Sequence, residues 1–406
     1  MDALMLPSNW QRVRLGDIAE IKRGASPRPI ENPKWFCTNS NVGWVRISDI
    51  SKNSRFLYKT AQKLSKKGIE KSRFIKQNSL IMSMCATIGK PIITKIDTCI
   101  HDGFVVFENP KIDLNYLYYF LCYIEKEWLE SGQQGSQVNL NVDLIKNKEV
   151  FYPKDLNEQI AIANILSDVD RYLYSLRALI LKKESVKKAL RIKMLNQILA
   201  SNGVEFRELG DIILSLKTGL NPRSFFKLNT PNANNYYVTI RELEDYTIKF
   251  THQTDRIDDN ALSLCLKRSN LEKDDILFSG TGTIGKVSII EKNPNNWAIK
   301  EGIYSIKPNK KIVFPRFLMF CLESSNIQND IKNKSFGGIV KSIPMNDLQQ
   351  IQIPLPPLNE QIAIANILSA LDNEIISLKN KKRQFENIKK ALNHDLMSTK
   401  IRVLKK

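Results

Sequence analysis

The chain reads Leu156-Asn157-Glu158-Gln159-Ile160-Ala161-Ile162-Ala163-Asn164-Ile165-Leu166-Ser167 near its middle, and the same segment returns, identical, from Leu358 to Ser369. The offset of 202 residues also carries Lys187-Lys188-Ala189-Leu190 onto Lys389-Lys390-Ala391-Leu392. Solenoid repeats are only roughly 20–50 residues long. A period of about half of the 406 residues therefore indicates the duplication of a whole domain together with its helix.

Each copy opens a long segment without glycine or proline, over residues 154–202 and 358–406. Apolar residues recur in both segments at alternating spacings of three and four, which is typical of a coiled-coil seam. The seam residues are Ile162, Leu166, Val169, Leu173, Leu176 and Ile180 in the first segment, and Ile364, Leu368, Leu371, Ile375, Leu378, Phe385 and Leu392 in the second. We predict two helices of roughly 45 residues, each about 65 Å long, that pair with each other. Two separate amphipathic helices, each packed on its own domain, are the alternative.

The segments before the helices are rich in short β-branched runs broken by Gly, Asn and Pro. They correspond only weakly, as where Lys22-Arg23-Gly24 matches Lys217-Thr218-Gly219. We predict an α+β fold with globular domains over 1–153 and 203–356, a central helix over 154–202 and a C-terminal helix over 357–406. Because the helices kept their sequence while the domains diverged, we infer one shared task for the helices and two different tasks for the domains.

Lysine and arginine number 61 against 42 aspartates and glutamates, which leaves a formal charge of +19. A basic surface attracts phosphate, and since these charges are spread along the whole chain they favour nucleic acid over a membrane surface. No apolar stretch approaches the ~18 residues of a membrane span. A signal-peptide pattern and paired cysteines are also missing, so we expect a cytoplasmic protein.

Known catalytic patterns are missing from the sequence, with one partial exception. Gly280-Thr281-Gly282-Thr283-Ile284-Gly285-Lys286 matches the glycine and lysine spacing of a phosphate-binding loop, but Val287 follows where Ser or Thr would hold magnesium. The residues after it, Val287 to Ile290, predict a strand, so we interpret the loop as a tight turn between strands. The three histidines lack metal-ligand spacing. We predict a non-enzyme, with a nucleotide-binding enzyme as an alternative.

Basic and amide side chains beside turns suit contacts to a phosphate backbone and to base edges. Taken singly, each such residue is more typical of a solvated loop, and only the total charge and the paired domains favour DNA. The candidate DNA-binding residues are Lys22, Arg23, Arg28, Arg46, Lys90, Gln134, Asn139, Lys217, Thr218, Arg223, Arg241, Thr283, Lys286 and Lys341.

The order of segments, and several motifs, resemble the specificity (S) subunits of Type I restriction-modification enzymes. Pro356-Pro357-Leu358-Asn359-Glu360-Gln361-Ile362-Ala363-Ile364-Ala365 is similar to the signature that opens the helices of that family. The stretch from Asp274 to Ser279, running into Thr283-Ile284-Gly285-Lys286-Val287, is similar to its target recognition domains. The first helix departs from the pattern, because Tyr152-Pro153-Lys154-Asp155-Leu156 stands where the family often has Pro-Pro-Leu.

The resemblance implies two target recognition domains, an antiparallel coiled coil and a pseudo-twofold axis. It implies that each domain reads half of a bipartite, asymmetric site in double-stranded DNA while the helices set the spacer. It also implies docking of two methyltransferase (M) subunits, which use S-adenosylmethionine, and two restriction (R) subunits, which use ATP and Mg²⁺, with no cofactor in this chain. A Type IIB-like modification system is the alternative within this class.

Overall fold

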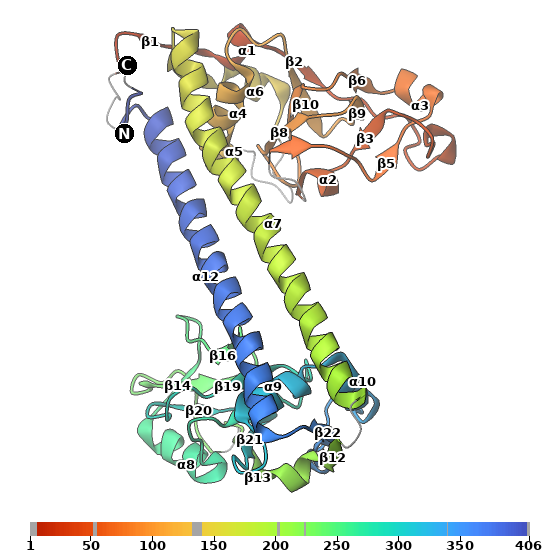
Figure 1. Ribbon diagram of the computed structural model, residues 1–406. Helices are drawn as coiled ribbons and strands as arrows, with labels where there is room; N and C mark the ends of the chain where they lie inside the picture. Colours follow the sequence, from red (N-terminus) through yellow and green to blue (C-terminus); the bar gives the residue numbers. More distant parts are fainter. Residues whose placement is uncertain are drawn as a thin grey trace. The chain divides into compact units, whose positions relative to one another are not determined.

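The computed structural model describes residues 6–51, 55–131, 140–200, 204–222, 225–338 and 340–403. The chain divides into two compact units, unit 1 of Met1–Leu176 and Lys382–Lys406, and unit 2 of Arg177–Lys381. Two long helices, α7 (Leu156–Ala200) and α12 (Leu358–Met397), cross this division. Each unit therefore holds one mixed domain and one part of each helix (Figure 1).

Unit 1 contains a two-stranded ribbon, two small sheets and short helices. The ribbon pairs β1 (Trp10–Arg14) with β11 (Glu149–Pro153). One sheet has the order β2 (Glu20–Arg23), β10 (Phe104–Glu108), β7 (Leu80–Ser83), β8 (Pro91–Thr94) and β4 (Phe56–Leu57). The other has the order β5 (Gln62–Lys63), β3 (Gly43–Val45), β9 (Thr98–Ile100) and β6 (Arg73–Ile75). The helices are α1 (Leu15–Ile18), η1 (Pro33–Trp35), α2 (Ile47–Ser51), α3 (Lys66–Glu70), α4 (Leu114–Tyr123), α5 (Glu125–Ser131) and α6 (Val142–Asn147).

Unit 2 repeats this plan. Its ribbon pairs β12 (Glu205–Glu208) with β22 (Gln352–Leu355). One sheet has the order β13 (Ile213–Thr218), β21 (Ile303–Pro308), β18 (Ile276–Ser279) and β19 (Val287–Ile289). The other has the order β17 (Arg256–Ile257), β14 (Asn235–Val238) and β20 (Trp297–Ile299), beside a hairpin of β15 (Leu243–Glu244) and β16 (Thr247–Ile248). The helices are η2 (Leu209–Ile212), α8 (Asp259–Ser269), α9 (Pro315–Leu322), α10 (Ser325–Asn333) and α11 (Met345–Gln349).

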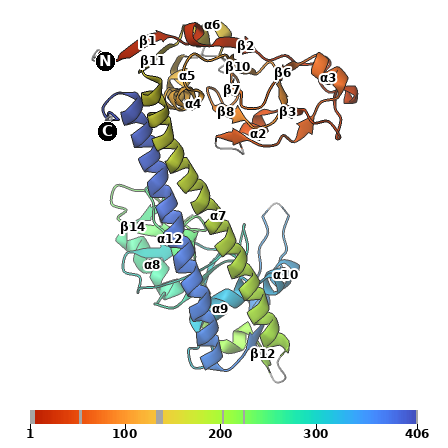
Figure 2. The same cartoon turned by 45° about the horizontal axis from the view of Figure 1, so that its top comes forward.

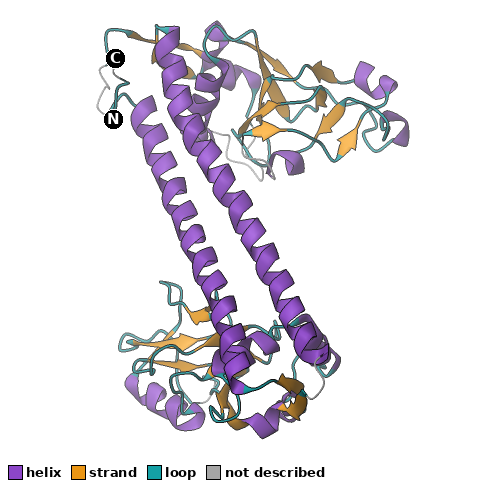
Figure 3. Ribbon diagram, in the orientation of Figure 1, coloured by secondary structure: helices purple, strands orange, loops and turns teal. Residues whose placement is uncertain are grey.

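The strand pairing shows that the two units share one topology. In unit 1, β10 lies antiparallel between β2 and β7, as β21 lies between β13 and β18 in unit 2. Each second sheet contains one parallel pair, β3 with β9 and β14 with β20. Figure 3 shows both units combining strands with helices. The predicted α+β fold with an internal repeat is confirmed.

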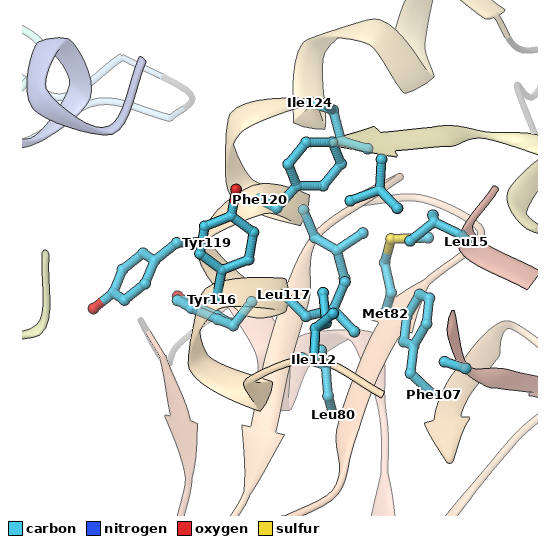
Figure 4. Close-up of a cluster of buried hydrophobic side chains, with 14 of the residues drawn as sticks. Leu15, Leu80, Met82, Phe107, Ile112, Tyr116, Leu117, Tyr119, Phe120 and Ile124 are labelled. Carbon is cyan, nitrogen blue, oxygen red and sulfur yellow. The ribbon is translucent and has the colours of Figure 1, made fainter. Parts of the chain in front are cut away.

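The main core of unit 1 lies where α4 packs on the larger sheet. Leu117 of α4 faces Met82 and Phe107 of the strands (Figure 4), and all three are buried. Ile162 and Leu166, at the start of α7, belong to the same cluster. Ala365 and Leu368, at the start of α12, join the corresponding core of unit 2. The opening turns of each helix thus pack on a domain as well as facing the other helix.

A buried glutamine fastens the start of each long helix to its domain. Gln159 is 3 % exposed; its Oε1 accepts from the N–H of Asp113 at 2.8 Å and its Nε2 donates to the carbonyl of Pro153 at 2.9 Å. Gln361 is 1 % exposed and does the same with the N–H of Phe314 and the carbonyl of Pro356, also at 2.8 and 2.9 Å. A buried amide needs these partners, because an unsatisfied polar group is costly. The repeated Asn-Glu-Gln sequence thus has a structural reason.

The two helices pair antiparallel in each unit. In unit 1 the Nζ of Lys389 lies 2.6 Å from Oδ1 of Asp170, and in unit 2 the Nζ of Lys187 lies 2.6 Å from Oδ1 of Asp372. The offset of 202 relates Asp170 to Asp372 and Lys187 to Lys389, so the two ion pairs are copies of each other with the helices exchanged. Figures 1 and 2 agree in drawing the first half of α7 beside the last part of α12. The antiparallel coiled coil is confirmed.

The C-terminal helix is shorter than predicted. It ends at Met397 instead of reaching residue 406, and Thr399 takes a left-handed backbone angle, φ +63°. Leu396 and Met397 are buried in the main core of unit 1. The helix therefore ends where its last residues pack against the domain. The helical pattern of the sequence does not predict this packing.

Candidate nucleic-acid interface

Two glycines fix the same turn in both domains. A side chain at Gly24 would lie 2.1 Å from the carbonyl oxygen of His101, and one at Gly219 would lie 2.0 Å from that of Ile299. Only glycine allows main chains to approach so closely. The residues before these glycines, Arg23 and Thr218, end β2 and β13 beside the turns 101–103 and 300–302.

Two of the candidate arginines of unit 1 converge on Asp102. Nε of Arg23 donates to the main-chain carbonyl of Asp102 at 2.7 Å, and Nη2 of Arg28 lies 3.0 Å from its carboxylate. Ser26 donates to the same carboxylate at 2.6 Å. This hydrogen bond from Ser26 is the main cause that lowers the pKa of Asp102, so the carboxylate is charged at neutral pH. Arg23 and Arg28 are both exposed.

A hollow of about 270 Å³ lies beside this cluster, within unit 1. Arg23, His101 and Asp102 line it together with Met84, Cys85 and Leu140. Burial, and then the charge of Arg46, lower the pKa of His101 to about 4. His101 is therefore neutral at physiological pH, and its Nδ1 accepts from the N–H of Gly103 at 2.9 Å. Arg46, another predicted DNA-binding residue, therefore lies near the same turn.

The candidates of unit 2 gather at the corresponding place with different chemistry. The hydroxyl of Thr218 accepts from the N–H of Gly302 at 3.2 Å and faces the carbonyl of Ile303 at 3.4 Å. The carbonyl of Lys341 accepts from the N–H of Gly282 at 2.8 Å, which places Lys341 at the edge of the glycine turn. Both Lys341 and Thr283 are exposed. At this strand end unit 2 therefore presents the hydroxyl of Thr218 where unit 1 presents the guanidinium of Arg23, while Arg223, the sequence counterpart of Arg28, lies outside the described residues.

The lysines of the two Thr-Ile-Gly-Lys turns donate to main-chain carbonyls of their own domains. Lys90 donates its Nζ to the carbonyl of Ile50 at 3.2 Å, and Lys286 donates to that of Ile240 at 3.1 Å. Each turn joins antiparallel strands, β7 to β8 and β18 to β19, and not a strand to a helix. A phosphate-binding loop needs a helix N-terminus at this point. A nucleotide site at Gly280–Lys286 is therefore not favoured.

The remaining candidates are scattered or paired. Lys22 lies 2.5 Å from Glu108 and 2.9 Å from Glu20, and these acidic partners raise its pKa. Arg241 lies 2.7 Å from Asp255, and Lys217 is half-buried on β13. Gln134, Asn139 and Arg223 lie outside the described residues. The role of every candidate in DNA binding stays a prediction.

Sequence reasoning missed the acidic residues of these turns. Asp102 in His101-Asp102-Gly103-Phe104 and Glu301 in Lys300-Glu301-Gly302-Ile303 occupy equivalent places, because Gly103 and Gly302 accept equivalent hydrogen bonds from Met84 and Gly280. An acid-glycine pair repeated in the two halves was the available signal. It was hidden by a shift in the offset, which differs here from the offset of the helices.

Neither a membrane-spanning helix nor a metal-ligand cluster is found in the part of the chain that the structure describes. None of its helices has a stretch apolar and long enough for a bilayer span. No group of three or more His, Cys, Asp or Glu side chains there is placed to hold a metal ion.

Two mixed domains alternate along the chain with two long helices that pair with each other. The family model of the type I restriction modification DNA specificity domain matches residues 7–183 and 201–387, so the chain belongs to this family. It is a specificity subunit of the type I restriction-modification class. Because the match is to type I proteins, the Type IIB-like alternative is not favoured.

Relatives agree along nearly the whole chain. The putative type I restriction enzyme MjaX specificity subunit of Methanocaldococcus jannaschii is 27% identical, covering 98% of this chain and 95% of the relative. The MjaVIII specificity subunit of the same organism is 24% identical, covering 99% and 95%. In fold, the type I S subunit from M. genitalium has a TM-score of 0.60 at 17% identity, covering 97% of this chain and 98% of that chain. A chain from a structure concerning assembly of the type I system has a TM-score of 0.57 at 16% identity, with the same coverage.

Proposed function

We propose that each unit reads one half of a bipartite, asymmetric DNA site. One observation carries this proposal: the same topology and the same glycine-closed turn present Arg23 in unit 1 but Thr218 in unit 2. Base pairs are distinguished by the side chains that reach their edges. Two domains of one fold with different side chains at one turn therefore read different sequences.

The helices, in this proposal, dock two copies of a methyltransferase subunit. Exposed apolar residues recur on both helices at equivalent positions, so the duplication preserves them in two copies. The equivalent pairs are Leu156 and Leu358, Ile160 and Ile362, Ile165 and Ile367, and Val186 and Ile388. Apolar residues that are exposed in the isolated chain, and that the duplication preserves in both helices, suit contacts with two identical partners.

The chemistry then belongs to the partners. The chain itself would be non-catalytic, S-adenosylmethionine would serve the methyltransferase subunits, and ATP with Mg²⁺ would serve two restriction subunits. The names of the relatives, which are specificity subunits, support this division of labour.

The test is to map methylated adenines in DNA from cells that express the full chain with its methyltransferase partner. We expect a single motif made of two unlike halves separated by unread base pairs. Methylation without a bipartite motif would contradict the proposal, and so would a palindromic motif with identical halves.

The helices are also proposed to set the spacer. Inserting seven residues after Ala178 and seven after Asn380 keeps the seam in phase, because seven residues are two turns of a coiled coil. At 1.5 Å per residue the added length is about 10 Å, or about three base pairs. We expect the spacer to grow by about three base pairs with both half-sites unchanged. An unchanged spacer in a stable, active complex would show that the helices do not measure it.

A further inference from the structure

The two units differ in charge at one equivalent strand end. Arg23 pairs with Val105 at the end of β2, and Thr218 pairs with Tyr304 at the end of β13. The N–H of Gly24 bonds to the carbonyl of Phe104, and the N–H of Gly219 bonds to that of Ile303. The next residues along are Val105 and Tyr304, so Arg23 and Thr218 occupy the same place in the two domains.

The guanidinium of Arg23 is held in one orientation while its far edge is open. Its Nε donates to the carbonyl of Asp102 at 2.7 Å, and among the described residues none accepts a hydrogen bond from its two Nη groups. Arg28 differs, because its Nη2 already faces the Asp102 carboxylate at 3.0 Å. The two Nη groups of Arg23 therefore remain as parallel donors without an acceptor among the described residues.

The surroundings suit a base edge better than a phosphate alone. Arg23 borders the hollow of about 270 Å³, whose walls include Met84, Cys85 and Leu140. Beside these less polar walls, a hydrogen bond made by Arg23 would be stronger than one made in open water. Two parallel donors on a fixed arginine match the O6 and N7 acceptors of guanine in the major groove.

We propose that Arg23 is a specificity-determining residue that reads a guanine in the half-site of unit 1. Thr218 cannot do so in unit 2, because its side chain is short and its hydroxyl already accepts a hydrogen bond from the N–H of Gly302. The inference rests on the proposed function, since it names the base contact that one of the two reading domains makes.

The test compares four chains, each expressed in full with the methyltransferase partner: the unchanged chain, Arg23→Thr, Arg23→Lys and Arg12→Thr. Arg23→Thr installs the residue of unit 2. Arg23→Lys keeps the charge but not the two parallel donors. Arg12→Thr is the matched control, because Arg12 is an exposed arginine of the β1–β11 ribbon paired with Glu149. The readout is the motif of methylated adenines, with the rate at each site.

We expect Arg23→Thr and Arg23→Lys to lose discrimination at one G·C pair of one half-site, on the order of 5- to 100-fold. The other half-site and the control should be unchanged. A rate that falls uniformly with the motif intact would show a phosphate contact and overturn the inference, as would an unaltered motif and rate. If Arg23→Thr does not fold, Arg23→Lys decides. If the unchanged chain directs no bipartite motif, the proposed function fails instead.

Discussion

The helix pair is stabilised by the same ion pair in both units but by different neighbours around it. Asp170 with Lys389 and Asp372 with Lys187 are copies related by the duplication. The next layer is aromatic in unit 1, where the rings of Tyr172 and Phe385 are 4.5 Å apart. At the equivalent positions of unit 2, Lys183 lies 2.9 Å from Glu374.

The domains differ around this pair as well. In unit 1 the buried Arg55 donates to the hydroxyl of Tyr119, which donates to Asp170 at 2.7 Å. In unit 2 the hydroxyl of Tyr246 accepts from Lys187 at 2.7 Å and donates to Glu323 at 2.6 Å. The shared ion pair sets the register of the helices, while each domain supplies its own polar partner.

The differing layer also distinguishes right from wrong pairing of the helices. If α7 paired with α7 of a second chain in the same register, Tyr172 would meet Lys183. If α12 paired with another α12, Glu374 would meet Phe385. Both mismatches separate complementary groups, and such mismatches are a known means of selecting one coiled-coil partner. The layer therefore favours pairing of α7 with α12.

The largest expected effect is on the seam. Leu173 and Ile375 are related by the duplication and are each 5 % exposed. Replacing either by Asp buries a charge and removes apolar contacts, at a cost of roughly 3–5 kcal/mol in the free energy of unfolding. Hydrogen exchange read by unit should show Leu173→Asp loosening unit 1 and Ile375→Asp loosening unit 2. Tyr174→Asp, at a position 75 % exposed, is the control and should change little. If one substitution increased hydrogen exchange equally in both units, the prediction that the two units lose stability separately would be wrong.

A smaller and unequal effect is expected at the two lysines. Lys187 is 8 % exposed and also bonds Tyr246, whereas Lys389 is more exposed. Lys187→Met should cost about 3 kcal/mol, since it leaves the part-buried Asp372 without its ion-pair partner. Lys389→Met should cost about 1 kcal/mol, because Asp170 keeps the hydroxyl of Tyr119. Denaturant unfolding measures both. Adding Asp372→Leu to Lys187→Met should recover most of the loss, and equal costs at the two lysines would contradict the asymmetry.

The smallest effect is expected from making the two layers alike. Lys183→Phe with Glu374→Tyr gives unit 2 the aromatic layer of unit 1. Both side chains are partly exposed, so the free energy of unfolding should change by less than about 1 kcal/mol. The mismatch against self-pairing is then gone, and light scattering should detect chains that exchange helices at high concentration. If the molar mass stayed that of a monomer at every concentration, the layer would not be what favours pairing of α7 with α12 over self-pairing.

The sequence predicted the helices and the repeat better than it predicted the site. Identical residues at a fixed offset and a sustained seam report directly on the helices. The end at Met397 was missed because burial of Leu396 and Met397 in the domain is a tertiary effect. Lys90 and Lys286 resembled DNA contacts, yet each donates to a main-chain carbonyl. Asp102 was missed because strand pairing brings it to Arg23 from far along the chain.

Gln159 and Gln361 hold the helices to the domains through main-chain atoms alone. Every amino acid except proline has the same main-chain N–H and carbonyl groups. These hydrogen bonds therefore do not depend on which side chains the domain carries. A domain could be exchanged by recombination at the helix boundary, and the new domain could form the same main-chain hydrogen bonds with the glutamine of the helix. The restriction system could then acquire a new target in a single recombination event, with the sequence of the long helices unchanged.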